Sequence, residues 1–464
     1  MTNQQFNTLV FGVFIGVTVT LFNVIYEVQQ EPYLDEVFHV PQAQKYCSWL
    51  FYEWDSKITT LPGLYLFSVG VLTPITALMR RDMCSVFSLR FINVIGSVAN
   101  FYILYSIHNK LYPSRKELNL MSSVNLAIFP VLYFFTFLYY TDVLSTLLVL
   151  LMYLLHLHKR RSLSAITGFL AVVTRQTNII WVGFVLLDTI FSILKETIVL
   201  QKKKPSSSSD KRLLYQKFLQ NAVMYPWGET VPFAALVKKL FQETVLLCAV
   251  CLSFVCFMGW NRGIVVGDRT AHQAVLHFSQ IHYFSLFSCC FGFPFLLANT
   301  RSVVNWVKMH KREAVTFLAV SLLVVHFNTL AHPYLLADNR HYTFYIWKRV
   351  YERYLLSRYL LIPVYLFGVI ASFEALRNAS PAMRMSLTLC VVLSLVPQKL
   401  LEFRYFILPY LFLRLHISRV VWWQLLLEFV VYAAVNAATI YLFISRTFTW
   451  PHSDQLHRFI TGSG

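Results

Sequence analysis

The sequence predicts an all-α polytopic membrane protein with about thirteen transmembrane helices. Of its 464 residues, 57% are hydrophobic and only 13% are charged, which is too little polar surface for a soluble chain of this length. The apolar residues gather in runs of about 20, the length of helix that crosses a hydrocarbon core roughly 30 Å thick. Clusters of Lys and Arg separate these runs, as in the short cytosolic loops of membrane proteins.

The expected membrane helices follow one another along nearly the whole chain. We place them at 9–26, 86–107, 118–138, 143–158, 163–177, 179–196, 242–260, 283–299, 314–331, 355–373, 385–397, 406–417 and 422–446. Several are short for a bilayer. The first run lacks a basic leader and a small-residue cleavage site, so we expect a retained signal anchor.

Basic loops set the expected orientation. They are Lys110 with Arg115 and Lys116, Lys159 to Arg161, Lys202 to Lys204 with Lys211 and Arg212, Lys308 with Lys311 and Arg312, Arg377 with Arg384, and Arg414 with Arg419. If these loops face the cytosol, the loops between them face the lumen. Counting the apolar stretch 61–79 as a span would invert every later loop. We therefore interpret it as a luminal juxtamembrane helix and accept Arg80 and Arg81 as exceptions.

The chain divides into two membrane modules joined by a polar loop. Residues 1–197 form the first module, with a luminal first loop at 27–85. Residues 198–240, which contain KKKPSSSSDKR, form a flexible cytosolic connector. Residues 241–464 form the second module, with luminal loops at 261–282, 332–354 and 397–405. The net charge of +18 follows from this topology, and no basic–aromatic motif indicates nucleic-acid binding.

Eight cysteines give no disulfide framework, because six of them lie inside apolar runs. Cys47 and Cys84 lie outside the runs, and whether they pair stays open. A metal site is not favoured either. His272 and His277 are five residues apart and do not share a helical face, and Asp268 with His272 is a weak ligand pair.

The polar, information-rich segments all fall on the luminal side of this topology. They are 31–46, 54–63, 139–142, 174–178, 261–280, 332–349 and 397–409, whereas the cytosolic loops are merely basic. An active site that faces the lumen explains this asymmetry, and a plain scaffold does not.

The first loop carries the clearest chemistry. Pro32 suits the first turn of a helix, and Asp35 and His39 then share one face at a spacing of four residues. Asp35 and Glu36 lie just beyond the first span, where partial desolvation raises the basicity of a carboxylate and suits a general base. The alternative is an acid that only caps or solvates a luminal helix.

The context of this loop resembles the GT-C glycosyltransferases. An acidic pair follows the first membrane helix, a luminal apolar helix opens with a proline, and Asp142 lies at the luminal tip of the next hairpin. The strings LDEVFHVPQAQKY, ITTLPGLYLFSVG, FLYYTD, TRQTNIIW, GIVVGDR, LLADNRHYTFYIWKR and VPQKLLEFRYFILPY are similar to signature segments of the dolichyl-phosphate-glucose-dependent α-1,2-glucosyltransferases. These matches extend from about residue 31 to residue 451.

The resemblance implies a fold and an activity. The fold would be of the GT-C type, in the endoplasmic reticulum membrane with a luminal active site. The enzyme would transfer glucose from dolichyl-phosphate-glucose to a diglucosylated, dolichyl-diphosphate-linked oligosaccharide for N-glycosylation, with inversion and without a cofactor. Asp35 would be the base and Glu36 the reserve base.

The other candidate residues fall into two groups. Arg175, Arg340, His341, Lys399 and Arg404 are candidates for the donor phosphate. His39, Gln42, Trp54, Asp55, Tyr140, Asp142, Asp268, Arg269, Asp338, Asn339 and Glu402 are candidates for sugar hydroxyls or sugar faces. For Glu402 and Arg404 a purely structural ion pair is an equal alternative, and for Trp54 and Tyr140 the aromatic belt of a membrane interface is one.

Two other functions are compatible with a polytopic chain. A lipid transporter would place ionisable residues near the bilayer midplane and break its helices in paired halves, and no internal repeat is apparent. A membrane regulator, for example a partner of an ion channel, could coexist with enzymatic activity.

Overall fold

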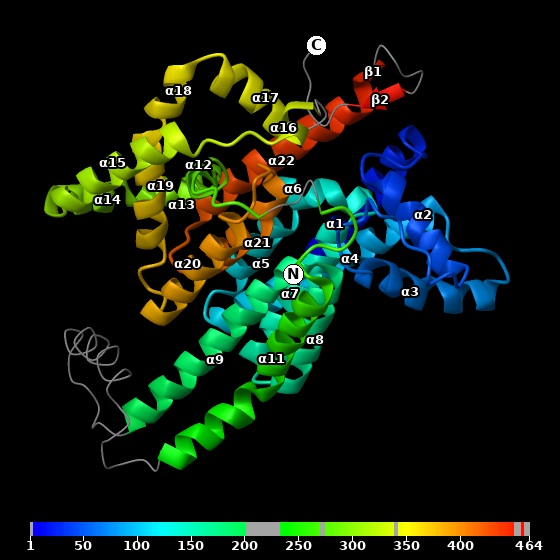
Figure 1. The fold of residues 1–464 in the computed structure, drawn as a ribbon, viewed down its shortest axis with the longest axis horizontal. Helices are drawn as coiled ribbons and strands as arrows, with labels where there is room; N and C mark the ends of the chain where they lie inside the picture. The colour runs from blue at the N-terminus through cyan, green and yellow to red at the C-terminus, as the bar shows by residue number, and fades with distance from the viewer. Residues whose placement is uncertain (1–2, 201–232, 270–273, 338–341, 450–455, 459–464) are drawn as a thin grey trace.

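The computed structural model describes residues 3–200, 233–269, 274–337, 342–449 and 456–458. Helices dominate this part of the chain, as predicted (Figure 1). A short antiparallel hairpin of β1 (Thr447–Thr449) and β2 (Leu456–Arg458) was not predicted. The candidates Arg340, His341, Asp338, Asn339 and His272 lie outside the described residues, as does most of the expected connector 198–240.

Eleven helical segments are described between residues 3 and 200. They are α1 (Asn3–Val28), α2 (Glu36–Cys47), α3 (Gly63–Met79), α4 (Val86–Leu111), α5 (Lys116–Ala127), α6 (Pro130–Tyr133), η1 (Phe134–Phe137), α7 (Thr141–Leu157), α8 (Arg161–Thr174), η2 (Gln176–Asn178) and α9 (Ile179–Leu200).

The helical pattern continues from residue 233 onward. Its described segments are α11 (Phe233–Asn261), α12 (Ser279–Phe291), α13 (Phe293–Leu296), η4 (Leu297–Asn299), α14 (Thr300–Met309), α15 (Lys311–Phe327), α16 (Pro333–Ala337), α17 (Tyr342–Ile346), η5 (Trp347–Glu352), α18 (Leu355–Leu360), α19 (Ile362–Ala375), α20 (Pro381–Leu395), η6 (Phe403–Phe406), α21 (Ile407–Leu415) and α22 (Trp422–Ser445).

The all-α polytopic class is confirmed, but the count of thirteen spans is not. Within the described residues, six helices are long and apolar enough to cross a membrane, or up to eight if each of two bent helix pairs is one span. The bends are 54° after α5 and 89° after α12. Pro130 begins α6 and Pro294 is the second residue of α13, because proline lacks an N–H and is tolerated in the first turn of a helix better than in its interior.

Helices α2 and α3 lie at one side of the molecule (Figure 1). Helix α3 coincides with the stretch predicted as a juxtamembrane helix. Gly63 opens it in close contact with α8, since a Cβ at this glycine would lie 2.6 Å from the Val173 oxygen and the Thr174 nitrogen. Only glycine allows this approach. Cys47 and Cys84 form a disulfide that ties the end of α2 to the segment before α4.

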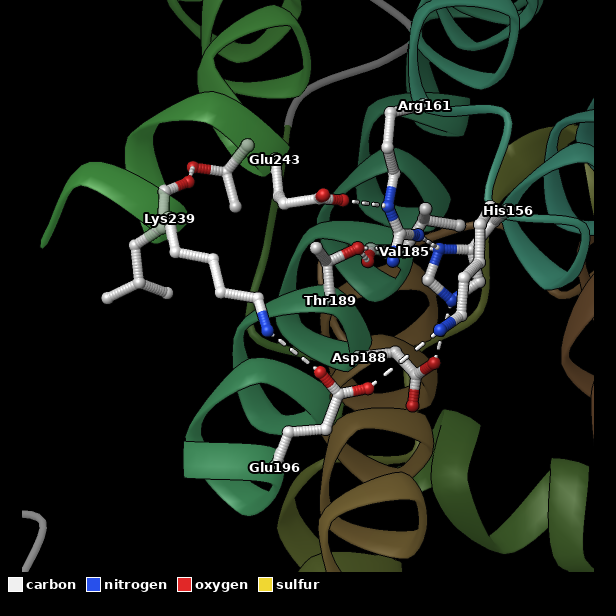
Figure 2. Close-up of polar contacts among 11 residues, drawn as sticks. His156, Arg161, Val185, Asp188, Thr189, Glu196, Lys239 and Glu243 are labelled. Carbon is white, nitrogen blue, oxygen red and sulfur yellow. Dashed lines mark hydrogen bonds and ion pairs between the residues drawn. The ribbon is translucent and has the colours of Figure 1, made fainter. Parts of the chain in front are cut away.

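A polar network connects four helices at the end of α7 that is remote from its first turn (Figure 2). His156 contacts Asp188 of α9 at 2.8 Å, and Arg161 of α8 donates to His156 Nδ1 at 2.6 Å and to Glu243 of α11 at 2.8 Å. Arginine only donates, so Nδ1 accepts and Nε2–H donates to Asp188. The predicted cytosolic cluster Lys159 to Arg161 therefore lies at the opposite end of α7 from Asp142.

Candidate active site

One guanidinium group lies among three carboxylates. Arg404 donates to Glu402 through Nε, and its Nη2 and Nη1 lie 3.4 Å from Asp35 Oδ2 and 3.6 Å from Asp142 Oδ2. Arg175 also donates to Asp142 Oδ1, at 2.6 Å. Five candidate residues from four separate segments of the sequence therefore meet in one place, and Glu402 and Arg404 form the ion pair that is one of the two interpretations of them. We call these five residues the Arg404 cluster.

Each member of the Arg404 cluster stands at or near the end of a helix. Asp35 directly precedes α2, Asp142 is in the first turn of α7, and Arg175 follows the last residue of α8. Arg404 lies in η6, which leads into α21. A carboxylate in the first turn of α7 also interacts favourably with the positive end of the helix dipole.

Arg404 stays a cation in this environment. The pKa of Arg404 is raised well above its ordinary value: burial lowers it, but the carboxylates of Glu402, Asp142 and Asp35 outweigh burial. The guanidinium carbon also lies 5.3 Å from the ring centres of both Phe135 and Tyr140. Aromatic faces attract a cation, so the rings help to hold Arg404 in place.

Asp35 is the accessible acid of the cluster. Its side chain is 50% exposed, against 1% for Asp142 and 11% for Glu402. Although Asp35 is at the N-cap position of α2, its carboxylate makes no capping hydrogen bond. Its backbone N–H donates to the Tyr140 hydroxyl at 2.8 Å. The helix-cap interpretation of Asp35 therefore finds no support in the structure.

Glu36, the reserve base, points in another direction. Its side chain is fully buried and forms an ion pair with Arg90 of α4 at 2.6 Å. Consecutive residues of a helix point about 100° apart, so one faces the Arg404 cluster and the other faces the protein interior. This position does not favour Glu36 as a base.

His39 lies one turn after Asp35, as the spacing predicts. Its Nδ1 is 2.5 Å from the Tyr65 hydroxyl, and its ring meets Tyr140 edge-on at 5.9 Å. Burial lowers the pKa of His39 to about 4; Arg404 and Arg175 add to this effect, and Asp35 and Asp142 oppose it. The imidazole is therefore neutral at neutral pH.

The lowered pKa predicts a pH dependence of stability. Between pH 6.5 and about 4, His39 binds a proton in the unfolded chain but not in the folded one. The free energy of unfolding should therefore rise with pH across this window, and this contribution is lost as the pH falls toward 4. In His39→Gln, the drop in thermal midpoint from about pH 7 to about pH 5 should be smaller than in the wild type by a few degrees. Equal drops in the two proteins would contradict the assignment.

A largely apolar cavity of about 220 Å³ has Arg404 and Glu402 among its lining residues. Phe134 and Phe135 of η1 form part of its wall, and Val435 and Thr439 of α22 form another part. A smaller cavity of about 40 Å³ also reaches Arg404 and is lined by Asp142, Arg175 and several hydroxyl and amide side chains. Arg404 thus joins an apolar compartment to a polar one.

Gln42 and Asp55, two predicted sugar ligands, bond to other residues of their own loop, and a third, Trp54, reaches His39 through Tyr65. Gln42 donates to the Glu53 oxygen at 2.7 Å and accepts from the Asp55 nitrogen at 2.9 Å, so it fixes this loop. The Asp55 carboxylate accepts from the Lys57 backbone N–H. Trp54 meets Tyr65 edge-on at 5.9 Å, and Tyr65 in turn contacts His39.

Three further candidates lie in loops that pack on neighbouring segments. The Asp268 N–H donates to the Ser56 oxygen at 2.8 Å, and its carboxylate lies 4.0 Å from Lys57. Arg269 donates to Asn261 at 2.9 Å. Lys399 is partly buried. It directly follows Gln398, whose backbone oxygen lies 3.1 Å from His277 Nδ1. These contacts do not bring Asp268, Arg269 or Lys399 into the Arg404 cluster.

Sequence reasoning missed several residues around the cluster. Arg90 is the clearest, and it carried a signal: an arginine inside the apolar run 86–107 is costly unless it is paired. No sequence signal distinguished Tyr65, Phe135 or Tyr405 from the other tyrosines and phenylalanines, of which the chain has 26 and 40 in all. The Tyr405 ring centre lies 5.7 Å from the Arg175 guanidinium carbon. No group of three His, Cys, Asp or Glu side chains that could hold a metal ion occurs within the described residues.

Comparison with known proteins decides the family. The family model of the DIE2/ALG10 family matches residues 29–415, which is most of the chain. The chain belongs to the DIE2/ALG10 family. A relative from Mus musculus is 42% identical over 463 residues, covering 96% of each chain. A relative from Arabidopsis thaliana is 34% identical over 504 residues, covering 94% of this chain and 96% of its own. Both are named Dol-P-Glc:Glc(2)Man(9)GlcNAc(2)-PP-Dol alpha-1,2-glucosyltransferase.

DIE2/ALG10 membership confirms the family that the signature segments predict, and with it the class of membrane α-1,2-glucosyltransferase. The alternatives of an ion-channel regulator and a lipid transporter find no support in the names of these relatives. No solved structure matches the chain.

Proposed function

We propose that this chain transfers glucose from dolichyl-phosphate-glucose to diglucosylated lipid-linked oligosaccharide, forming an α-1,2 linkage, and that the Arg404 cluster is its active site on the luminal side of the endoplasmic reticulum membrane. One observation carries the assignment of the site. Arg404 lines a largely apolar cavity, and its Nη2 lies 3.4 Å from the half-exposed Asp35 carboxylate. The proposed lipid site, phosphate ligand and base would therefore be adjacent.

The apolar cavity suits the isoprenoid chain of the donor. Its walls are aromatic and aliphatic, and one of them belongs to α22, which is long and apolar enough to span the bilayer. A lipid chain could therefore enter from the membrane without exposing apolar surface to water. The phosphate, which must stay hydrated or paired, is proposed to lie beside Arg404.

Arg404 and Arg175 are the proposed phosphate ligands. Their charge-assisted hydrogen bonds would strengthen as negative charge gathers on the departing phosphate. Arg340 and His341 are further proposed ligands, because they precede by two to three residues Thr343, which lines the apolar cavity. Lys399 is a more distant proposed ligand.

The proposed reaction is a single displacement. The 2-hydroxyl oxygen of the acceptor glucose attacks C1 of the donor glucose, and its proton passes to the Asp35 carboxylate. The bond from C1 to the phosphate oxygen breaks, and its electron pair leaves with dolichyl phosphate. One displacement converts a β-linked donor into an α-linked product, without a covalent glycosyl–enzyme intermediate.

The remaining polar residues receive supporting roles. The Tyr140 hydroxyl accepts from the Asp35 backbone N–H, and the His39 ring meets Tyr140 edge-on. Both residues are proposed to bind sugar hydroxyls or a sugar face. Asp142 and Glu402, which are largely buried, are proposed to orient Arg175 and Arg404 rather than to bind sugar. Asp338 and Asn339 stay proposed sugar ligands on the strength of the sequence.

The function is tested with the purified full-length protein in detergent. Radiolabelled dolichyl-phosphate-glucose is incubated with acceptors that carry two, one or no glucose residues. We expect one glucose to be added to the diglucosylated acceptor and far less to the others. If the protein transfers glucose to none of the three acceptors although its thermal unfolding shows that it is folded, the proposal is contradicted.

The luminal placement of the site makes a separate prediction. The sequon at Asn378 should stay unmodified, because its loop is expected to be cytosolic and Pro381 follows it. The sharper probe is a new glycosylation sequon introduced between residues 198 and 212, which should also stay unmodified in cells. A sequon placed in the first luminal loop, near Asp82, serves as the positive control. Modification of the 198–212 probe would reverse the orientation.

A further inference from the structure

We propose that Glu36 and Arg90 form a clamp that positions Asp35 for proton transfer, an inference that rests on the proposed role of Asp35. Both side chains are fully buried. Arg90 Nε lies 2.9 Å from Glu36 Oε1, and Arg90 Nη2 lies 2.6 Å from Glu36 Oε2. Two parallel bonds between a guanidinium and a carboxylate fix both distance and orientation.

The clamp also binds the backbone of the two segments that carry Asp35 and Asp142. The Tyr33 N–H donates to Glu36 Oε2 at 2.9 Å, and the Tyr139 N–H donates to Oε1 at 2.5 Å. Arg90 also donates to the carbonyl oxygens of Gln29 and Glu31, just after α1. One ion pair therefore joins the end of α1, the turn before α2 and the segment before α7.

A second set of contacts connects the clamp to Asp35 itself. Tyr140, next to the clamped Tyr139, accepts from the Asp35 N–H at 2.8 Å. Asn93, one turn after Arg90 in α4, donates to the oxygens of Leu138 and Tyr140 at 2.6 and 3.0 Å. Contacts made by α4 therefore help to fix the position of Asp35 relative to Asp142 and Arg404.

Backbone strain directly before Asp35 indicates why a clamp is needed. Leu34 has a φ of 55°, in the left-handed region that side chains with a Cβ avoid. Such residues persist where the surrounding structure holds them, and they concentrate at active sites. Tyr33 and Glu36, which flank Leu34 and Asp35, are bonded to each other by the clamp. Without it, the turn can relax and aim the Asp35 carboxylate away from Arg404.

Glu36 acts through position rather than by touching substrate. Each of its oxygens already accepts two hydrogen bonds, one from Arg90 and one from a backbone N–H. No accessible lone pair remains for a sugar hydroxyl. Glu36 is therefore a positioning residue.

The chain supplies a matched control for the loss of a buried ion pair. Arg414 and Glu428 are equally buried and form the same pair of bonds, both 2.9 Å long. Arg414 lies at the far end of α21 from Arg404. Glu36→Gln and Glu428→Gln each leave a buried arginine without its carboxylate, so both should lower the thermal midpoint.

The two variants should differ in catalysis. In Glu36→Gln we expect kcat per folded enzyme to fall roughly 100-fold, the effect of a misplaced reacting group, with donor and acceptor KM within about threefold of wild type. In Glu428→Gln, kcat per folded enzyme should stay within about twofold of wild type. Arg90→Lys keeps the buried charge pair and serves if Glu36→Gln does not fold; its kcat should lie between those of wild type and Arg90→Gln.

If Glu36→Gln and Glu428→Gln lose activity only in proportion to the loss of folded protein, the clamp is overturned. A wild-type kcat per folded enzyme in Glu36→Gln has the same consequence. The same assay with Asp35→Asn separates the two proposals. An inactive Asp35→Asn beside a fully active Glu36→Gln removes the clamp alone, and an active Asp35→Asn removes the base on which it rests.

Discussion

Replacing Asp35 by Asn is expected to lower turnover by about two to four orders of magnitude, the usual range for loss of a general base. The substitution keeps the shape of the side chain and removes only the proton acceptor. The backbone N–H bond to Tyr140 should persist, because it does not involve the carboxylate. Donor and acceptor binding should therefore change little, and the effect should appear in single-turnover rates with both substrates saturating.

Asp82→Asn is the control for removing a carboxylate from the loop between α1 and α4. Asp82 is exposed, and its oxygen accepts from the Cys84 N–H, a bond that an asparagine oxygen can also make. Its turnover should stay close to that of the wild type. Near-normal turnover in Asp35→Asn would make the first-loop acids structural, since Glu36 is enclosed by Arg90 and backbone donors.

Replacing Arg404 by Gln is expected to lower kcat/KM for the donor by roughly 30- to 1,000-fold, equivalent to about 2–4 kcal/mol for one lost charge-assisted contact to a developing phosphate dianion. Arg404 is a cation that lines the apolar cavity, the proposed donor site, so donor use should suffer more than acceptor binding. The measurement is initial rates over a range of donor concentrations at saturating acceptor.

Arg404→Lys separates charge from geometry. Lysine keeps the positive charge among Asp35, Asp142 and Glu402, but it cannot reproduce the planar fork. Its kcat/KM for the donor should lie between those of the wild type and Arg404→Gln, with a thermal midpoint closer to wild type. Unchanged donor kinetics in both variants would move the phosphate site to Arg175 or Lys399.

The helical architecture could be predicted from the sequence because apolar runs of bilayer length have few other solutions. The bends after α5 and α12 could not be predicted, since their angles depend on how neighbouring helices pack around Pro130 and Pro294. The pairing of Cys47 with Cys84 also stayed open, because it depends on the distance between α2 and α4.

The acids and cations of the site could be nominated from the sequence, but their meeting could not. Arg404 contacts Asp35 although the two residues are 369 positions apart in the sequence. A single sequence does not show which distant residues lie close together in space. The roles of Asp35 and Glu36 illustrate the same limit. Helical geometry predicts that they point apart, but only the buried Arg90 shows which one faces inward.

The anomeric configuration of the transferred glucose tests the central claim most directly. A single displacement with Asp35 as the base converts the β-linked donor into an α-linked product. Nuclear magnetic resonance of the isolated triglucosylated product, or digestion with linkage-specific glucosidases, should show an α-1,2 bond. A β-linked product would mean retention of configuration at C1, which a single in-line displacement cannot give, and would contradict the proposed mechanism.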